Sequence, residues 1–305
     1  MSAEGSPPQQ APEPLGAPTA TLTGRSVAVE VLVLYLGSCF VIRLIKEAVN
    51  GWNLAADWLV LVALVFFYTP VVAERFRNYR VPGDVLYPEG PIIRLRRIPL
   101  LGGREFSFQA PQLRTPLLWW GIVVLLIYPV FIPGYHLWQS WGFNRFTIEL
   151  LSLAQESETL HWLLVDVLGM WGPYPRFHPD FAVRGFPPDL ALIILYQLIC
   201  VGYAEEYFYR GYMQTRLDSV FRPDRFQLFG AKFGWSLPVV AVLFTLGHAL
   251  VEPRLWQPFI LFPALLFGWL RARTGNVLAA TLFHAWANTV MIVLDHIYGI
   301  TSAGS

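Results

Sequence analysis

The stretch that decides the fold reads "DLALIILYQLICVGY" over residues 189–203 and continues as "AEEYFYRGYMQTRL" over residues 204–217. The first part is nearly all apolar, which is typical of a membrane-spanning helix. The second part adds two adjacent glutamates, Glu205 and Glu206, and then Arg210. An ionisable side chain at the bilayer centre costs about 3 kcal/mol or more, so such residues indicate a functional site.

The composition of the whole chain agrees with a membrane protein. Of 305 residues, 55% are hydrophobic and 14% are charged, whereas a soluble domain carries about 25% charged residues. The formal net charge of +1 gives no indication of nucleic-acid binding. We predict an all-α polytopic membrane protein, a bundle of about seven to eight transmembrane helices with an intramembrane polar site.

Hydropathy predicts spans near residues 27–45, 57–73, 117–133, 189–208, 235–250, 257–270 and 277–295. The segment "LHWLLVDVLGMW" (160–171) is open to three interpretations: an interfacial helix, a re-entrant helix or an eighth span. Four tryptophans fit an interface belt, namely Trp119, Trp120, Trp138 and Trp141.

Four parts of the chain follow from these spans. We expect a disordered tail over residues 1–26, transmembrane helices and loops over 27–186, a second helical part over 187–296 that forms the core, and a short tail over 297–305. The first residues, rich in Pro, Ala and Gly, lack the pattern of a cleaved signal peptide. The stretch "YPEGPIIRLRRIPLLGGREFSF" (87–108) is either a short hairpin or a surface-lying segment.

Basic residues in the loops predict the orientation. Segment 74–114 holds eight arginines against four acids, and further basic residues follow the glutamates and the sixth span. With seven spans, all these clusters fall on one side, which the positive-inside rule makes cytoplasmic. We therefore expect the N-terminus in the cytoplasm of a multi-pass integral membrane protein.

Other polar residues occur in the late spans. "LFTLGH" (243–248) places His248 in an apolar run, and "LFHAWANTV" (282–290) places His284 and Asn288 four residues apart, on one helix face. Polar groups in hydrocarbon seek one another, so a single shared polar cavity is the simplest arrangement.

The spacing of the charged residues predicts different roles for the two glutamates. Glu206 and Arg210 are four apart and share a helix face, while Glu205 points about 100° away. One acid is thus paired and its neighbour stays free for chemistry. The alternative is a helix end at the interface, with all three charges in water.

This set of residues is sufficient for hydrolysis. A glutamate in a pocket of low dielectric is a general base suited to neutral pH, and a histidine beside it helps to deprotonate a water. An imidazole and an amide on one face can donate hydrogen bonds to a developing oxyanion.

The motifs EExxxR (Glu205, Glu206, Arg210), FxxxH (Phe244, His248) and HxxxN (His284, Asn288) resemble the CPBP, or Abi, superfamily. This superfamily includes the Ras-converting CAAX endopeptidase and bacteriocin-processing relatives. The resemblance covers residues 187–295 approximately. The context "EEYFYRGYMQTRL" is also similar to the bacterial subgroup called myxosortases, which are thought to trim C-terminal sorting tails.

The resemblance implies a glutamate-type intramembrane endopeptidase in a bacterial inner membrane. It would cut a membrane-associated protein or peptide near its C-terminal end, without a cofactor. Glu205 and His248 would activate water, and His284 and Asn288 would form the oxyanion hole. Glu206, Arg210 and Phe244 would support them.

Two alternatives stay open. Glu and His are also zinc ligands, although the HExxH signature is absent from the sequence. The same polar cavity would also serve a non-catalytic scaffold or a transporter. The predicted spans also place Glu205 towards the cytoplasmic end of its helix and His248 towards the outer end, although both would have to meet in one site. An extended, tilted helix over residues 190–217 would bring Glu205 nearer the middle of the membrane, and a span that runs past residue 250 would place His248 deeper.

Overall fold

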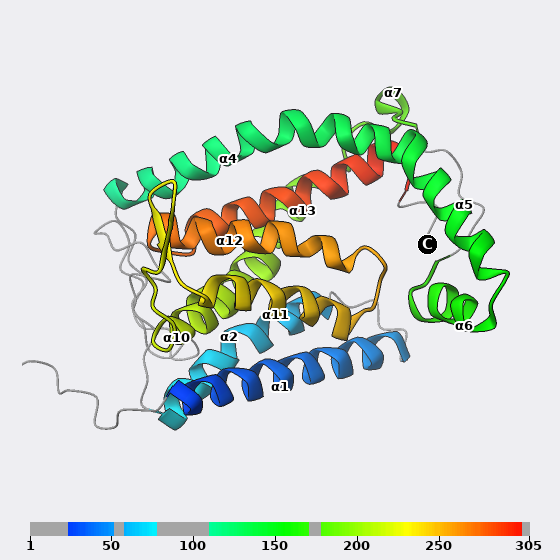
Figure 1. Ribbon diagram of the computed structural model, residues 1–305. Coiled ribbons are helices and arrows are strands. Elements are labelled where there is room, and N and C mark those ends of the chain that lie inside the picture. The colour runs from blue at the N-terminus through cyan, green and yellow to red at the C-terminus, as the bar shows by residue number, and fades with distance from the viewer. Residues whose placement is uncertain (1–23, 52–57, 78–109, 171–177, 301–305) are drawn as a thin grey trace, which may run out of the picture.

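The structure is a computed structural model that describes residues 24–51, 58–77, 110–170 and 178–300 (Figure 1). The segment 87–108 and the last five residues therefore lie outside the described residues. The predicted N-terminal tail also lies outside them, except that its last residues already belong to the first helix. That helix, α1, spans Gly24–Gly51.

The described chain is built from apolar helices, as predicted. All seven predicted spans are helical, and the helices besides α1 and the central helix are α2 (Trp58–Arg77), α4 (Ala110–Leu137), α11 (Ser236–Val251), α12 (Leu261–Thr274) and α13 (Leu278–Tyr298). Four helical stretches are long and apolar enough to cross a membrane, namely Gly24–Val49, Leu113–Ala154, Leu190–Asp218 and Leu278–Tyr298. The all-α membrane class is confirmed.

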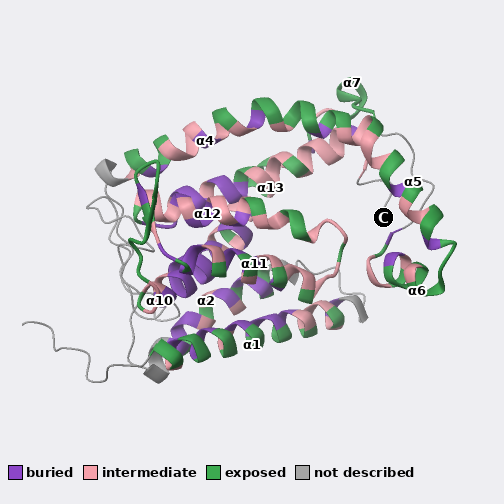
Figure 2. Cartoon of the chain, viewed as in Figure 1, coloured by how far each residue is buried: buried purple, intermediate pink, exposed green. Residues whose placement is uncertain are grey.

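The apolar stretch with Glu205, Glu206 and Arg210 forms one continuous helix over Leu190–Asp218, here called the central helix. It runs through α8 (Leu190–Tyr196), a π-helical segment over Gln197–Tyr203, α9 (Ala204–Glu206), a second π-helical segment over Tyr207–Gln214 and α10 (Thr215–Asp218). It packs against α2, α11, α12 and α13. Burial increases along it, and every residue from Tyr207 to Gln214 is buried (Figure 2).

The two ends of the bundle are different. At one end a hairpin of β1 (Phe226–Leu228) and β2 (Ala231–Phe233) lies beside the first residues of α4 and the last of α12 (Figure 1). We call this the hairpin end. At the opposite end, the loop end, α11 joins α12 through residues 252–256 and a 3₁₀ turn over Gln257–Ile260. The hairpin is a small addition to the predicted all-α fold.

Helix α4 lies on the outside of the bundle and faces lipid. Leu125, Leu126 and Val130 are each at least 70% exposed, which is expected of apolar side chains that contact hydrocarbon rather than water. Trp119 and Trp138, near its two ends, are separated by about 28 Å at 1.5 Å per residue. That distance is close to the ~30 Å hydrocarbon core of a bilayer, and the tryptophan belt stays a prediction.

The helix of α4 continues past its predicted end. A π-helical turn over Trp138–Gly142 leads into α5 (Phe143–Ala154), so one helical stretch runs from Leu113 to Ala154. The predicted eighth span is only α6 (Glu158–His161) and a π-helical turn over Trp162–Val167. Ten helical residues reach about 15 Å, which is too short to cross a membrane. The eighth-span interpretation is therefore wrong, and the interfacial or re-entrant interpretations remain.

One core joins the early and the late helices. Tyr35 of α1, Phe66 of α2 and Tyr128 of α4 belong to the same buried cluster as Phe208 and Phe244. Helices α1 and α2 pack directly against the central helix, α1 also packs against α11, and α4 packs against α12 and α13.

Candidate active site

Glu205 and Glu206 lie near the middle of the central helix, between its two π-helical segments. The span end predicted near residue 208 is wrong and the extended helix over residues 190–217 is confirmed, because the helix continues to Asp218. Glu205 therefore lies at mid-helix, and the predicted mismatch in depth with His248 disappears. Turns of π-helix are rare and often occur at functional sites.

A glycine brings the central helix close to α13. A Cβ atom on Gly202 would lie 3.0 Å from the carbonyl oxygen of Thr281 and 3.3 Å from the amide nitrogen of Ala285. Only glycine leaves room for this approach of backbone to backbone. The close contact carries Glu206 to within hydrogen-bonding distance of α13.

The carboxylate of Glu206 is fully buried and paired. Its Oε1 accepts a hydrogen bond from Arg210 Nη1 at 2.9 Å, and both side chains are 0% exposed. Arg210 also donates to the carbonyl oxygen of Ala264 at 2.9 Å, and its guanidinium lies over the ring of Phe244, 4.4 Å from the centroid. A buried charge is tolerated when it is paired and hydrogen-bonded in this way.

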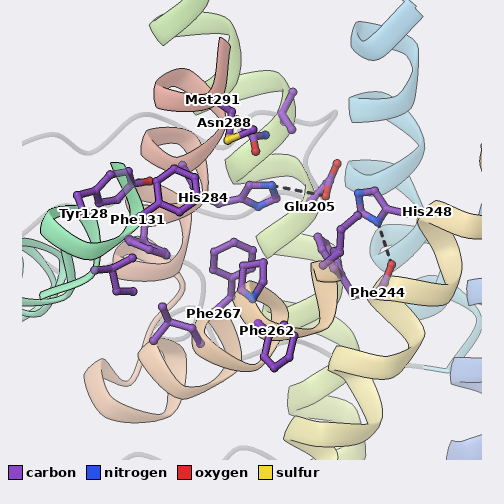
Figure 3. A pocket seen from close by; sticks show the side chains of 17 residues that line it. Tyr128, Phe131, Glu205, Phe244, His248, Phe262, Phe267, His284, Asn288 and Met291 are labelled. Carbon is purple, nitrogen blue, oxygen red and sulfur yellow. Dashed lines mark hydrogen bonds and ion pairs between the residues drawn. The ribbon is translucent and has the colours of Figure 1, made fainter. Parts of the chain in front are cut away.

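His284 of α13 connects the two glutamates. Its Nδ1 lies 3.0 Å from Glu206 Oε1, and its Nε2 lies 3.9 Å from Glu205 Oε2. Because the carboxylate of Glu206 is an acceptor, Nδ1 carries hydrogen and donates it. The imidazole also stacks on Phe267, with ring centroids 4.7 Å apart. The ring is thereby held with Nε2 directed towards Glu205 (Figure 3).

His248 lies near the last turn of α11, on the other side of Glu205 from His284 (Figure 3). Its Nδ1 lies 2.9 Å from the carbonyl oxygen of Phe244, four residues earlier. A carbonyl only accepts, so Nδ1 is the donor and Nε2 is left with its lone pair. That nitrogen can take a proton.

Asn288 lies one turn beyond His284 on α13, and its Nδ2 donates to Gln197 Oε1 at 2.9 Å. Gln197 is buried and was not among the predicted site residues. The signal that would have found it is its position as a lone polar residue in the apolar run "LALIILYQLIC" (190–200), since polar residues within spans are often functional.

Glu205, His248, His284 and Asn288 all line one cavity of about 510 Å³, called here the main cavity. The rest of its wall is mostly apolar and comes from α4, α12 and α13, with Tyr128, Phe131, Phe262, Phe267 and Met291 among the lining residues (Figure 3). Phe244 lines it as well. Glu206 and Arg210 do not; they lie behind it in the core.

One carboxylate oxygen of Glu205 has no hydrogen-bond donor among the described residues. Its Oε2 is buried and accepts no hydrogen bond from any described residue, and its side chain is 12% exposed. A buried carboxylate oxygen in this state needs a donor from outside the protein, such as a water or a substrate.

The described residues contain no group of three or more His, Cys, Asp or Glu side chains placed to hold a metal ion. Glu206 Oε1 already accepts hydrogen bonds from Arg210 and His284.

Comparison with known proteins gives one match. Residues 187–290 match the family model described as Type II CAAX prenyl endopeptidase Rce1-like. No curated protein and no solved structure matches the chain. The matched segment contains the central helix, α11, α12 and most of α13, and thus all four polar residues of the main cavity. The match supports an integral membrane protease of the CAAX type that acts on a membrane-associated peptide, and it shows that residues 187–290 are similar to proteins of the CPBP superfamily.

Proposed function

We propose that the protein is a glutamate-type intramembrane endopeptidase. The observation that carries this proposal is the meeting of Glu205, His248, His284 and Asn288 at one cavity with an apolar wall. An apolar wall suits a hydrophobic peptide, and the polar residues supply a base and hydrogen-bond donors at one place.

The reaction adds water across one peptide bond. Glu205 takes a proton from a water that His248 Nε2 helps to hold, and the water oxygen bonds to the carbonyl carbon. The resulting oxyanion accepts hydrogen bonds from His284 and Asn288. The proton then passes to the leaving nitrogen as the carbon–nitrogen bond breaks, which yields a carboxylate and an amine.

The two oxyanion donors have different requirements. Asn288 uses one hydrogen of its Nδ2 on Gln197 and keeps the second for substrate. His284 uses Nδ1–H on Glu206, so its Nε2 donates only when both ring nitrogens carry hydrogen. A ring that carries hydrogen on both nitrogens would suit a developing negative charge.

We further propose that the enzyme acts in a bacterial inner membrane with its N-terminus in the cytoplasm. Arg216, Arg271 and Arg273 lie at the hairpin end, and Lys232 belongs to the hairpin itself, so the positive-inside rule makes that end cytoplasmic. His248 lies near the opposite, loop end. A C-terminal tail on the outer face of the membrane, as in surface proteins with sorting tails, would meet the site from there.

The test begins with the natural substrate. Membrane proteomes of cells with and without the gene are compared for a protein whose C-terminal mass changes, and that protein is then used with purified enzyme in nanodiscs. Glu205→Gln should lower the cleavage rate about 10²–10⁴-fold, the usual effect of losing a general base. Glu149→Gln, on exposed α5, is the matched control and should cleave normally. Normal cleavage by a folded Glu205→Gln enzyme would remove Glu205 from the mechanism.

A further inference from the structure

A second, smaller cavity of about 140 Å³ adjoins Glu205 and His248. It is formed by α1, α2, the central helix and α11, and Cys39, Val62, Tyr209, Glu252 and Gln257 are among its lining residues. The two cavities share Glu205 and His248, whereas their other lining residues are different. These two side chains therefore form the partition between the main cavity and the second one.

The second cavity holds buried acceptors that need donors. Glu205 Oε2 and Gln257 Oε1 are both buried, and neither has a hydrogen-bond partner among the residues that the structure describes. Such atoms in proteins are normally satisfied by ordered water. At ~30 Å³ per molecule, the cavity has room for a short chain of waters between these two atoms.

Charged groups surround the cavity where it reaches the loop end. Glu252 pairs with Lys46 at 2.8 Å, Gln257 donates to the backbone oxygen of Glu252 at 3.0 Å, and Arg43 donates to that of Val251 at 2.7 Å. Burial opposes the charge on Glu252, but hydrogen bonds from Lys46 and Arg254 outweigh it and hold the pKa of Glu252 below its ordinary value. The ionised Glu252 and the basic Lys46 and Arg43 lie near helix ends, where charged side chains normally contact water at the membrane surface.

The main cavity has the opposite character. Its wall is rich in Phe side chains, and an apolar peptide that fills it would expel water. A hydrolase that binds its substrate in this way needs water to arrive from another direction.

We propose that the second cavity is a water chamber, which stores the hydrolytic water and supplies it from the loop end while substrate fills the main cavity. This inference rests on the proposed proteolysis. Water enters beside Glu252 and Gln257 and reaches Glu205 and His248 from the α1–α2 side. The oxygen of this water then bonds to the carbonyl carbon of the peptide, which lies in the main cavity on the other side of Glu205 and His248.

Thiol labelling tests the chamber without any need for activity. Cys39 lines the chamber and is 7% exposed, and the only other cysteine, Cys200, is removed as Cys200→Ala. Purified protein in nanodiscs is treated with a small, positively charged methanethiosulfonate. The matched control moves the thiol by one residue, in Cys39→Ala with Phe40→Cys, because Phe40 is 65% exposed on the outer face of α1.

Cys39 should react about tenfold faster or more than the thiol at position 40, because the reagent follows water and does not enter lipid. Equal rates, or no reaction at Cys39, would overturn the chamber. If the enzyme cleaves no substrate at all, the proposed function fails, and this labelling result still stands by itself.

Kinetics test the role of the chamber in turnover. Cys39→Leu partly fills it, whereas Cys39→Ala leaves it open. The leucine variant should lose about tenfold or more in kcat, equivalent to ~1.4 kcal/mol, with KM unchanged because the main cavity is intact. The alanine variant should keep wild-type kcat. If Cys39→Leu melts early, Val62→Met fills the chamber from α2 instead. A well-folded plugged variant with wild-type kcat would show that water arrives by another route.

Discussion

His284 and Arg210 share one carboxylate oxygen: Glu206 Oε1 lies 3.0 Å from His284 Nδ1 and 2.9 Å from Arg210 Nη1. The three groups form a buried chain from the core of the central helix to the face of the main cavity. The hydrogen bond from Arg210 fixes the position of the Glu206 carboxylate, and Glu206 in turn orients His284. The folding of this region and its chemistry therefore depend on the same pair.

Arg210→Ala should destabilise the protein strongly. The change leaves Glu206 buried without its partner, which costs roughly 3–5 kcal/mol, and it removes the contact with Phe244. Arg145→Ala is a matched control, since Arg145 and Glu149 are also four residues apart but are each 66% exposed. That exposed pair should contribute at most about 1 kcal/mol. The stability of both variants is measured as folded yield and melting temperature in detergent. Equal stability of the two variants would contradict a stabilising role of Arg210.

The pairing of Glu206 with Arg210 could be predicted because it depends only on helical spacing. The contact between Glu206 and His284 could not, since it depends on how closely α13 approaches the central helix. The predicted end of that helix was wrong for a related reason. Arg210, Arg216 and Asp218 resemble charges at a membrane surface, but in the structure they are paired with Glu206, Glu30 and Arg271. Two of these partners, Glu30 and Arg271, are distant in sequence, and the sequence alone does not show that they pair with this end of the helix.

The four polar residues of the main cavity were expected to meet because unpaired polar groups in apolar spans have few other partners. Their motif order along the chain also agreed with the family resemblance. Gln197 and the second cavity were missed. Gln197 belongs to no motif, and the cavity depends on side chains from α1 and α2, whose sequences contain no motif that relates them to Glu205.

Gly202→Ala should disturb both stability and catalysis. Its new Cβ would lie 3.0 Å from two carbonyl oxygens, those of Gln197 and Thr281, and backbone atoms do not move aside easily. Overpacking of this kind costs about 1–3 kcal/mol. The shift between helices should also lengthen the Glu206–His284 contact and lower kcat.

Gly121→Ala is the matched control for this change, because nothing lies within 4 Å of its Cβ position on α4. Alanine is favoured over glycine in a helix by about 1 kcal/mol, so this variant should be as stable as the wild type or more so. Melting curves and turnover of both variants are compared. A Gly202→Ala protein that behaves like Gly121→Ala would mean that the two helices can separate freely.

Activity should survive strong chelators. The described residues offer no cluster of three metal-ligating side chains, and Glu205 and His248 can activate water without an ion. Purified enzyme is treated with phenanthroline and assayed before and after addition of zinc. Loss of activity that zinc restores would favour the zinc-protease alternative.

His284→Ala and Asn288→Ala should each lower kcat about 10²–10³-fold, as expected for the loss of one oxyanion donor, with little change in KM. If these side chains only bridged helices, they would contribute about 0.6 kcal/mol to stability and nothing specific to turnover. Kinetics on a C-terminal tail peptide and melting curves in detergent separate the two roles. Variants that melt early but turn over at the wild-type rate in the cold would exclude the oxyanion assignment.

Gln197 gives the sharpest test of the same assignment, because it touches Asn288 and does not line the main cavity. If Gln197 Oε1 orients the Asn288 amide, Gln197→Leu should lower kcat by less than Asn288→Ala does. The double variant should then be no slower than Asn288→Ala alone, since an orienting residue has nothing left to orient. If the two residues acted independently, the fold losses in kcat of the two single variants would multiply in the double variant. A double-mutant cycle on kcat decides between these outcomes, and a multiplied loss would mean that Gln197 acts on the reaction without Asn288.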